Sequence, residues 1–396
     1  MVHILLEENA TYADATENTL IRWNVEHIDD DVCDSDSRGA YRTTLASFVE
    51  DRIFAALAAL PTETIQHAPY IPIFVASSSR SGSVQLNVGL PPDLEESETA
   101  WLRLLPPIST YDDNKIPLHK IDNVLVLDIF DTGTRGISLV GLPGDTLAVA
   151  QSVPSAPMIA SPSSRRSHGD GVLHEMHVLS SIPPHPNLIG PPIAYIWREC
   201  ELGPRVCGFA VRFCPGGCLA DIIERGAVEL SRRSKWAYHV SSALEHVHHV
   251  ARTYHGDIKL DNVVIDAEDN AILIDFEQGR ANDEAAAPEL RAGCRVELLA
   301  NGKLRYVLPN PEDAPPSSTR HRLYPYEGWK DTPAAIEAAE VHTFGVAFRK
   351  VFSETEVAFQ DMLKRCTRED PNERPSFEEL QLFFGEQLDE LQVLWG

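Results

Sequence analysis

The chain has 396 residues, of which 43% are hydrophobic and 23% are charged, so it has enough apolar material for a folded core and does not have the composition of a disordered protein. Its formal net charge is −25, from 34 Lys and Arg against 59 Asp and Glu. This charge argues against nucleic acid and anionic membranes as partners, because phosphate binding needs clustered cations, and it favours basic protein partners.

No segment has the pattern of an export signal or a membrane span. The first residues lack a basic segment followed by a long apolar one, and no apolar run approaches the ~20 residues that cross a bilayer. The seven cysteines are sparse and odd in number, which is typical of a reducing compartment. We therefore expect a cytoplasmic or nuclear protein.

Residues 1–115 contain no cluster of chemically active side chains, and we interpret them as an N-terminal extension of unknown role. The apolar spacing of residues 42–60 predicts a helix that ends at Pro61. Residues 70–75 have the character of a short strand, and a Ser- and Gly-rich loop is expected at 77–83.

From residue 116 the pattern changes to short apolar runs separated by Gly and Asp turns, which predicts an antiparallel meander. A Ser- and Pro-rich loop is expected over 154–171, and after the turn at 215–217 the pattern becomes helical. The sequence thus predicts an α+β protein with a small β-rich N-lobe (116–213) and a larger helical C-lobe (214–396). The expected strands are 124–130, 137–142, 147–149, 193–197 and 206–213, and the expected helices are 172–180, 219–224, 230–250 and several after residue 333.

The strongest chemical signal is the run YHGDIKLDNVVIDAEDNAILIDFEQG at 254–279. It places Asp257, Lys259 and Asn262 before a predicted hairpin and Asp275 directly after it. One carboxylate can orient and deprotonate a hydroxyl, while an amide and a second carboxylate offer the oxygen ligands that Mg²⁺ prefers. A lysine nearby can steady a phosphoryl group in transfer.

This run resembles the protein kinase family, whose loop H-R-D-x-K-x-x-N is followed by D-F-G. The resemblance implies a bilobal protein kinase fold over residues 116–396 with ATP and Mg²⁺ as cofactors. It implies that Asp257 is the catalytic base and Lys259 the lysine that contacts the phosphate. It also implies that Asn262 and Asp275 are the metal ligands.

Two later motifs agree with this resemblance. Residues 340–345 (EVHTFG) resemble D-x-W-S-x-G, and residues 370–376 (DPNERPS) resemble D-P-x-x-R-P-S. In the family this arginine, here Arg374, pairs with a buried glutamate at the end of the activation segment. The candidates are Glu289, in a literal A-P-E, and Glu327. We choose Glu327 because its separation from Glu340 is close to the family interval, which predicts a long activation segment over 275–327.

Upstream, the run VRFCPGGCL at 211–219 resembles the hinge between the lobes. The resemblance places Val211 at the gatekeeper position and the backbone N–H of Cys214 against the adenine edge. A zinc site is the rival interpretation of this cysteine-rich region, but no paired C-x-x-C is present, so we favour hinge packing. Among the histidines at 246, 248, 249 and 255, His248 and His255 match family positions rather than a metal site.

The predicted N-lobe departs from the family pattern. Asp131, Gly133 and Gly136 stand where the family has its Gly-rich phosphate loop, and a plain hairpin turn is the alternative interpretation. Gln151 takes the place of the N-lobe lysine, so Glu175, which matches the glutamate of the following helix, lacks its usual partner. Glutamine offers only a neutral donor. We expect Arg135, in preference to Arg165 or Arg166, to supply the missing charge.

The C-lobe has departures of its own. Gly256 replaces the catalytic-loop arginine that usually binds a phosphorylated activation loop, and neither Ser nor Thr occurs between Phe276 and Pro316, so control of this kind should be absent. Glu277 stands where the family has the glycine of D-F-G. These features resemble the aminoglycoside and choline kinase branch of the superfold, whereas Lys259 and the Arg374 motif favour the protein kinase branch and Ser/Thr specificity.

The resemblance therefore implies transfer of the γ-phosphoryl group of ATP, with Mg²⁺, to Ser or Thr hydroxyls of a basic protein substrate. One alternative is a pseudokinase that acts as a nucleotide-binding or scaffold module. Gln151, Asp131 and Glu277 favour that alternative, while the intact set of Asp257 and its three polar neighbours in the motif argues against it. A small-molecule phosphotransferase is a further alternative. The sequence does not indicate the oligomeric state.

Overall fold

The structure is a computed structural model that describes residues 3–6, 73–78, 84–88, 102, 105–111, 115–130, 136–152, 162–226, 228–278, 285–308 and 326–395. At residues 3–6, 73–78, 84–88, 162–170, 327 and 392–395 it describes the backbone alone. The helix expected at 42–60 lies outside these residues. In the N-terminal part, β1 (His3–Leu6), β2 (Ile73–Ser78) and β3 (Val84–Val88) form a three-stranded sheet. Strand β2 lies in the middle and pairs parallel with β1 and antiparallel with β3.

A six-stranded sheet forms the N-lobe, with the order β4-β8-β9-β7-β6-β5. The expected meander is confirmed, because β5, β6 and β7 pair antiparallel in succession. Strands β9 and β8 continue the sheet with further antiparallel pairs. Strand β4 was not predicted; it pairs parallel with β8 at one edge. The strands are β4 (Leu118–Lys120), β5 (Leu125–Ile129), β6 (Ile137–Leu142), β7 (Thr146–Ser152), β8 (Ala194–Arg198) and β9 (Arg205–Arg212).

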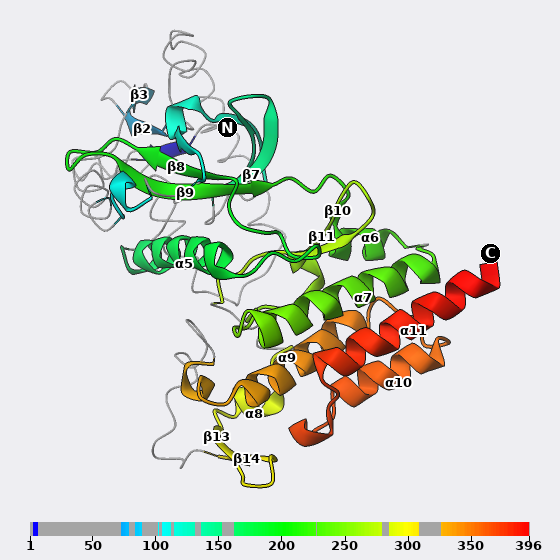
Figure 1. The fold of residues 1–396 in the computed structure, drawn as a ribbon. Coiled ribbons are helices and arrows are strands. Elements are labelled where there is room, and N and C mark those ends of the chain that lie inside the picture. Colours follow the sequence, from blue (N-terminus) through cyan, green and yellow to red (C-terminus); the bar gives the residue numbers. More distant parts are fainter. Residues whose placement is uncertain are drawn as a thin grey trace, which may run out of the picture.

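Helix α5 (Pro162–Ser181) lies between this sheet and the helices of the C-lobe (Figure 1). The sequence predicted a helix only over 172–180 and a loop over 154–171, and this boundary was wrong. The Ser and Gly residues of the first turns have low helix propensity, which hid the start of the helix. The apolar residues of its C-terminal half, Val172, Met176 and Leu179, are buried in the shared core and hold the helix in place.

The C-lobe is helical, as predicted, and is built around α9 (Pro333–Phe348), most of whose residues are buried. Pro333 stands at the first position of this helix, where its missing N–H costs no hydrogen bond. Helices α7 (Leu230–Glu245) and α11 (Phe377–Trp395) run side by side (Figure 1), and Phe384 of α11 packs against Phe344 of α9. The other helices of this lobe are α6 (Leu219–Arg225), α8 (Pro288–Arg291) and α10 (Val357–Cys366).

Short elements complete the fold. Helix α7 continues into a π-helix, η4 (His246–Val250), which leads into the loop that contains Asp257. The hairpin predicted after Asn262 is confirmed as β11 (Val263–Ile265) and β12 (Ala271–Leu273), with β10 (Gly217–Cys218) beside β11. The 3₁₀ helices are Ile108–Thr110, Ile121–Asn123, Leu260–Asn262, Glu327–Trp329 and Pro371–Glu373.

The two lobes share one continuous apolar core, which includes residues of the sheet, of α5 and of α7. The segment after α5 joins them, because Leu273 N donates to Asn187 O at 2.9 Å and Ile189 N donates to Leu273 O at 3.1 Å. A further hairpin, β13 (Arg295–Leu298) with β14 (Leu304–Val307), follows α8 and was not predicted. The predicted α+β class, with a β-rich part followed by a helical part, is thus confirmed.

Candidate active site

The loop between η4 and β11 carries a buried carboxylate. Asp257 is 7% exposed. Its Oδ2 accepts hydrogen bonds from Lys259 Nζ at 2.5 Å and from Asn262 Nδ2 at 3.1 Å. Asn262 Nδ2 also donates to the backbone oxygen of Asp257 at 2.8 Å, so the amide oxygen is the atom of this side chain that can bind a cation. The two donors fix the orientation of the carboxylate, as proton transfer from a hydroxyl requires.

Glu340 of α9 holds the backbone of this loop from below. Its Oε1 accepts the N–H of Gly256 at 2.5 Å, both oxygens lie 3.1 Å from the N of His255, and Oε2 lies 2.7 Å from His248 Nε2. Burial by itself would raise the pKa of Glu340, but the hydrogen bond from His248, the proximity of both histidines and the Gly256 N–H lower it overall. The glutamate therefore stays ionised and anchors the loop.

His255 connects the loop to the segment that follows β12. Its Nε2 lies 2.8 Å from the backbone oxygen of Ile274, and its Nδ1 accepts the N–H of Asp257 at 3.2 Å. Because Nδ1 accepts this N–H, it is Nε2 that carries a proton and donates to the carbonyl. The ring is fully buried and packs edge to face against Phe276 at 4.7 Å between centroids. The backbone of Asp257 is thus fixed relative to residues 274–276.

Asp275 begins a short segment of unusual backbone conformation. Its φ is +67°, in the left-handed region that non-glycine residues rarely occupy. The N–H of the next residue, Phe276, donates to Glu175 Oε1 of α5 at 2.9 Å. Helix α5 therefore holds the position of Asp275 through the backbone of its neighbour.

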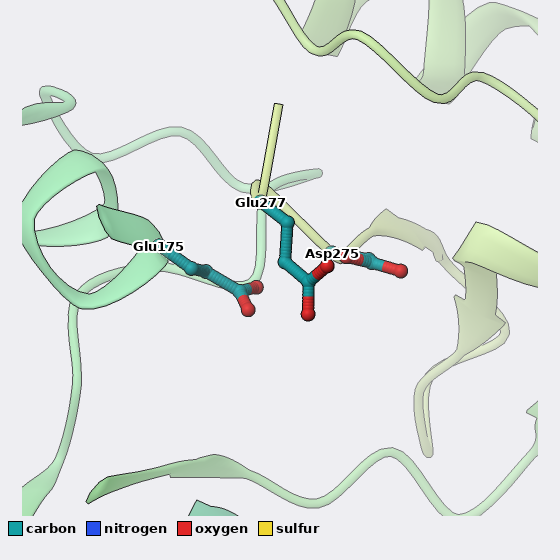
Figure 2. Close-up of side chains that lie close together, drawn as sticks. All are labelled: Glu175, Asp275 and Glu277. Atoms are coloured by element: carbon teal, nitrogen blue, oxygen red, sulfur yellow. The ribbon is translucent and has the colours of Figure 1, made fainter. Parts of the chain in front are cut away.

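Three carboxylates gather beside this segment. One oxygen each from Glu175, Asp275 and Glu277 lies within 4.8 Å of the others (Figure 2). Ionised carboxylates so close repel one another, so donors or a cation must compensate. One donor is the amide of Gln151 on β7, whose Nε2 donates to Glu277 Oε1 at 3.1 Å. The sequence analysis noted Glu277 as a departure but did not place it beside Gln151, because the two are far apart in the chain.

A cleft with a volume of about 650 Å³ lies between the lobes at this place. Apolar side chains from the sheet and from Ile274 form part of its wall, and Arg212 is the cationic side chain among the described residues that line it. Its acidic lining residues are Glu175, Asp221, Asp261 and Asp275. The cleft therefore combines an apolar wall, which suits an aromatic ring, with oxygen donors, which suit a hard cation.

The cleft brings together most of the residues that the sequence singled out as a site. Its lining includes Gln151, Glu175, Val211, Cys214, Asn262 and Asp275. Asp257 and Lys259 do not line the cleft themselves and are joined to it through Asn262.

The expected phosphate loop is described only at its end. Asp131, Gly133 and Arg135 lie outside the described residues, and the side chains of Arg165 and Arg166 are likewise not described. Gly136 has a φ of +58°, and a Cβ on it would stand 2.5 Å from the oxygen of Ser152. The close approach of these two backbone segments therefore requires glycine at position 136.

The choice of Glu327 as the partner of Arg374 was wrong. Arg374 Nη1 and Nη2 donate to Glu289 Oε1 at 2.6 Å and Oε2 at 3.0 Å, and the two side chains are 0% and 7% exposed. The chain interval misled because the β13–β14 hairpin is inserted between α8 and α9. Asn372 fastens that hairpin by hydrogen bonds to both backbone groups of Leu304. The segment after Asp275 thus ends at Glu289 and is short.

The rival zinc interpretation finds no support in the described residues. The group of carboxylates around Asp275 is the one metal-competent cluster found among them, and it contains neither cysteine nor histidine. Burial raises the pKa of Cys207 to about 12 and also raises the pKa values of Cys214 and Cys218, so these thiols stay protonated. Cys218 Sγ lies 3.7 Å from the oxygen of Leu260, which indicates hinge packing.

Comparison with known proteins finds a matching family and three curated relatives. Residues 158–294 match the protein kinase domain family. The chain is 37% identical over 67 residues to the hormonally up-regulated neu tumor-associated kinase of Homo sapiens and, to the same extent, to the protein of that name in Pan troglodytes. The match covers 17% of this chain and 9% of either relative. No helix in the described part of the chain is both long and apolar enough to cross a membrane.

Proposed function

We propose that the protein kinase-like domain of this chain binds ATP with Mg²⁺ and transfers the γ-phosphoryl group to Ser or Thr hydroxyls of a protein substrate. The observation that carries the proposal is the arrangement around Asp257. A buried carboxylate held by Lys259 and Asn262 adjoins, through Asn262, a cleft that also contains Asp275. Phosphoryl transfer asks mainly for positioning and charge compensation, and this set of groups supplies both.

The donor set fits Mg²⁺ by its chemistry. The amide oxygen of Asn262 and the carboxylate of Asp275 are hard oxygen ligands, and Glu175 and Glu277 add carboxylate oxygens near Asp275. When bound, Mg²⁺ would neutralise charge that develops on the phosphates. Backbone groups at the hinge, with Val211 and Cys214 in the cleft wall, would bind the adenine.

The roles of the protein groups follow from their contacts. Asp257 would accept the proton of the substrate hydroxyl, since its carboxylate is fixed by two donors and does not need to reorient. Lys259, whose Nζ lies 2.5 Å from that carboxylate, would place its charge beside the group in transfer. Glu340 and His255 would keep the loop in position without touching the substrate.

A second candidate function, a nucleotide-binding or scaffold module without transfer, is favoured by the pair Gln151 and Glu277. An amide that donates to a carboxylate replaces the cation that the family places at position 151. Among the described residues that line it, the cleft is therefore poorer in positive charge than an ATP site usually is. A small-molecule phosphotransferase remains the third candidate.

One experiment separates these functions. The full chain is incubated with γ-labelled ATP, Mg²⁺ and a basic protein substrate, beside Asp257→Asn and the control Asp361→Asn, which removes an exposed carboxylate of α10. We expect label on Ser or Thr of the substrate, a loss of at least ~100-fold in Asp257→Asn and no loss in the control.

Other outcomes identify the rivals. Equal background in all three proteins, together with a rise in melting temperature on addition of ATP and Mg²⁺, would establish the scaffold. Label that stays in small molecules when candidate alcohols and aminoglycosides are supplied would establish the third candidate.

A further inference from the structure

A buried glutamine that the proposed mechanism does not use lies directly behind the candidate site. Gln278 is 4% exposed and has a φ of +55°, a conformation that costs a non-glycine residue about 1 kcal/mol or more. Its Nε2 donates to the backbone oxygen of Tyr254 at 2.6 Å and to Thr253 Oγ1 at 2.9 Å. Its Oε1 lies 2.9 Å from Nε2 of His174. The amide therefore joins the start of the catalytic loop to helix α5.

Helix α5 is bound to this segment at two successive residues. His174 contacts the side chain of Gln278, and Glu175 accepts the N–H of Phe276. The two contacts lie on either side of Glu277, just after Asp275. A shift of α5 would break both, so the placement of the helix and the placement of Asp275 are coupled through this segment.

Gly256 provides the space for the backbone of Gln278. It has a φ of +89°, and a Cβ on it would stand 3.0 Å from the Cα of Gln278 and 3.2 Å from its carbonyl carbon. A larger residue at 256 would press against Gln278 and displace its amide. The glycine in the catalytic loop and the left-handed glutamine therefore form one packed arrangement.

The short segment offers no group for phosphorylation. Residues 275–289 contain no Ser, Thr or Tyr, and Gly256 stands where a guanidinium would otherwise face that segment. The placement of residues 275–278 must therefore come from permanent contacts, and the Gln278 amide supplies three of them.

We propose that Gln278 is a positioning residue that holds α5, the segment after Asp275 and the catalytic loop in one fixed arrangement without phosphorylation of residues 275–289. The proposal rests on the proposed function for its consequence, phosphoryl transfer, but the arrangement itself can be measured without transfer. Gln278 acts through Asp275 and Asp257 and touches no substrate.

The test is hydrogen exchange of α5, followed by mass spectrometry of peptides from 171–181 in the nucleotide-free full chain. We expect Gln278→Met and His174→Ala each to speed exchange of these amides by about tenfold, because each removes the same link. The double variant should be no faster than the faster single variant. His177→Ala, on the exposed face of the same helix, is the matched control and should exchange as the wild type does. Phosphatase treatment of the wild type should change nothing.

Additive effects of the two substitutions, equal effects in His177→Ala, or faster exchange after phosphatase treatment would overturn the proposal. If Gln278→Met does not fold, His174→Ala decides alone, because it breaks the same link from a half-buried position. Where the wild type transfers phosphate, the two variants should also lower kcat about tenfold with KM for ATP little changed, and an unchanged kcat would contradict the inference. If the wild type transfers no phosphate but the two variants still exchange faster than it does, only the proposed function is removed.

Discussion

At position 151 this chain has the amide of a glutamine, whereas the family that it resembles has the ammonium group of a lysine. The amide donates to a side chain that the family lacks at the matching position. Gln151 donates to Glu277, which replaces the glycine of the family motif. The two departures are therefore one local exchange, in which a neutral donor and a carboxylate meet across the cleft. A hydrogen bond to a charged acceptor contributes about 1.5–3 kcal/mol, but it brings no positive charge for phosphates.

This exchange predicts the effect of restoring the cation. Gln151→Lys would place an ammonium group beside Glu277 and its two carboxylate neighbours, where it lowers their repulsion and attracts phosphate. We expect the Kd for ATP with Mg²⁺, measured by titration calorimetry, to fall about tenfold, since charge-assisted hydrogen bonds are about twice as strong as neutral ones. Gln151→Met, which keeps the size and removes the donor, is the control and should bind no better than the wild type. An unchanged or higher Kd in Gln151→Lys would show that cation and phosphates do not meet there.

Among the elements, helix α8 is held to the C-lobe by the buried pair of Glu289 and Arg374. Besides the glutamate, the guanidinium donates to the backbone oxygens of Arg368 and Ala338, so all its contacts are inside the protein. An arginine charge buried in this way needs its counter-charge, because removal of one partner leaves the other unpaired in a region of low dielectric constant.

We therefore expect Glu289→Gln to lower the free energy of unfolding by about 3 kcal/mol, at the lower end for a broken buried pair because glutamine can still accept one hydrogen bond. Urea denaturation of the full chain measures the change. Glu327→Gln is the control, because Glu327 is the other candidate partner of Arg374, and this variant should unfold as the wild type does. The reverse result would restore Glu327 as the partner of Arg374.

The elements also show which features a sequence can predict. Strand β6 and the hairpin β11–β12 were predicted closely, because alternation and turn residues are local signals. The polar run from Asp257 to Asp275 was predicted to meet at one place because its spacing is set by that hairpin. The start of α5, the partner of Arg374 and the links of Gln278 were missed. Each depends on packing between segments distant in the chain, and a chain interval cannot reveal an insertion such as β13–β14.

On the scale of the whole molecule, two histidines lie where the segment after α5 packs against the C-lobe. The ring of His185 lies tilted against that of His246, with 4.9 Å between ring centroids. Its Nδ1 accepts the N–H of Asn187, and its Nε2 lies 3.3 Å from Ser242 Oγ of α7. His239 of α7 accepts the N–H of Ala271 on β12. Burial above all lowers the pKa of both to about 4, with a smaller effect of His246 on His185 and of Lys235 on His239.

The lowered pKa values of His185 and His239 should make the protein less stable in mild acid. Between pH 6.5 and 4 the unfolded chain binds protons at both histidines and the folded chain does not, so the free energy of unfolding falls as the pH falls through this range. Each histidine contributes at most ~1.4 kcal/mol per pH unit.

His239→Asn keeps an acceptor for the Ala271 N–H and removes one titrating group. We expect urea denaturation at pH 7, 6 and 5 to give a shallower decline for this variant than for the wild type. Carboxylates add little above pH 5, because their unfolded pKa values are near 4. If the free energy of unfolding declines equally with pH in the wild type and in His239→Asn, the buried ring at 239 does not contribute to the loss of stability in acid.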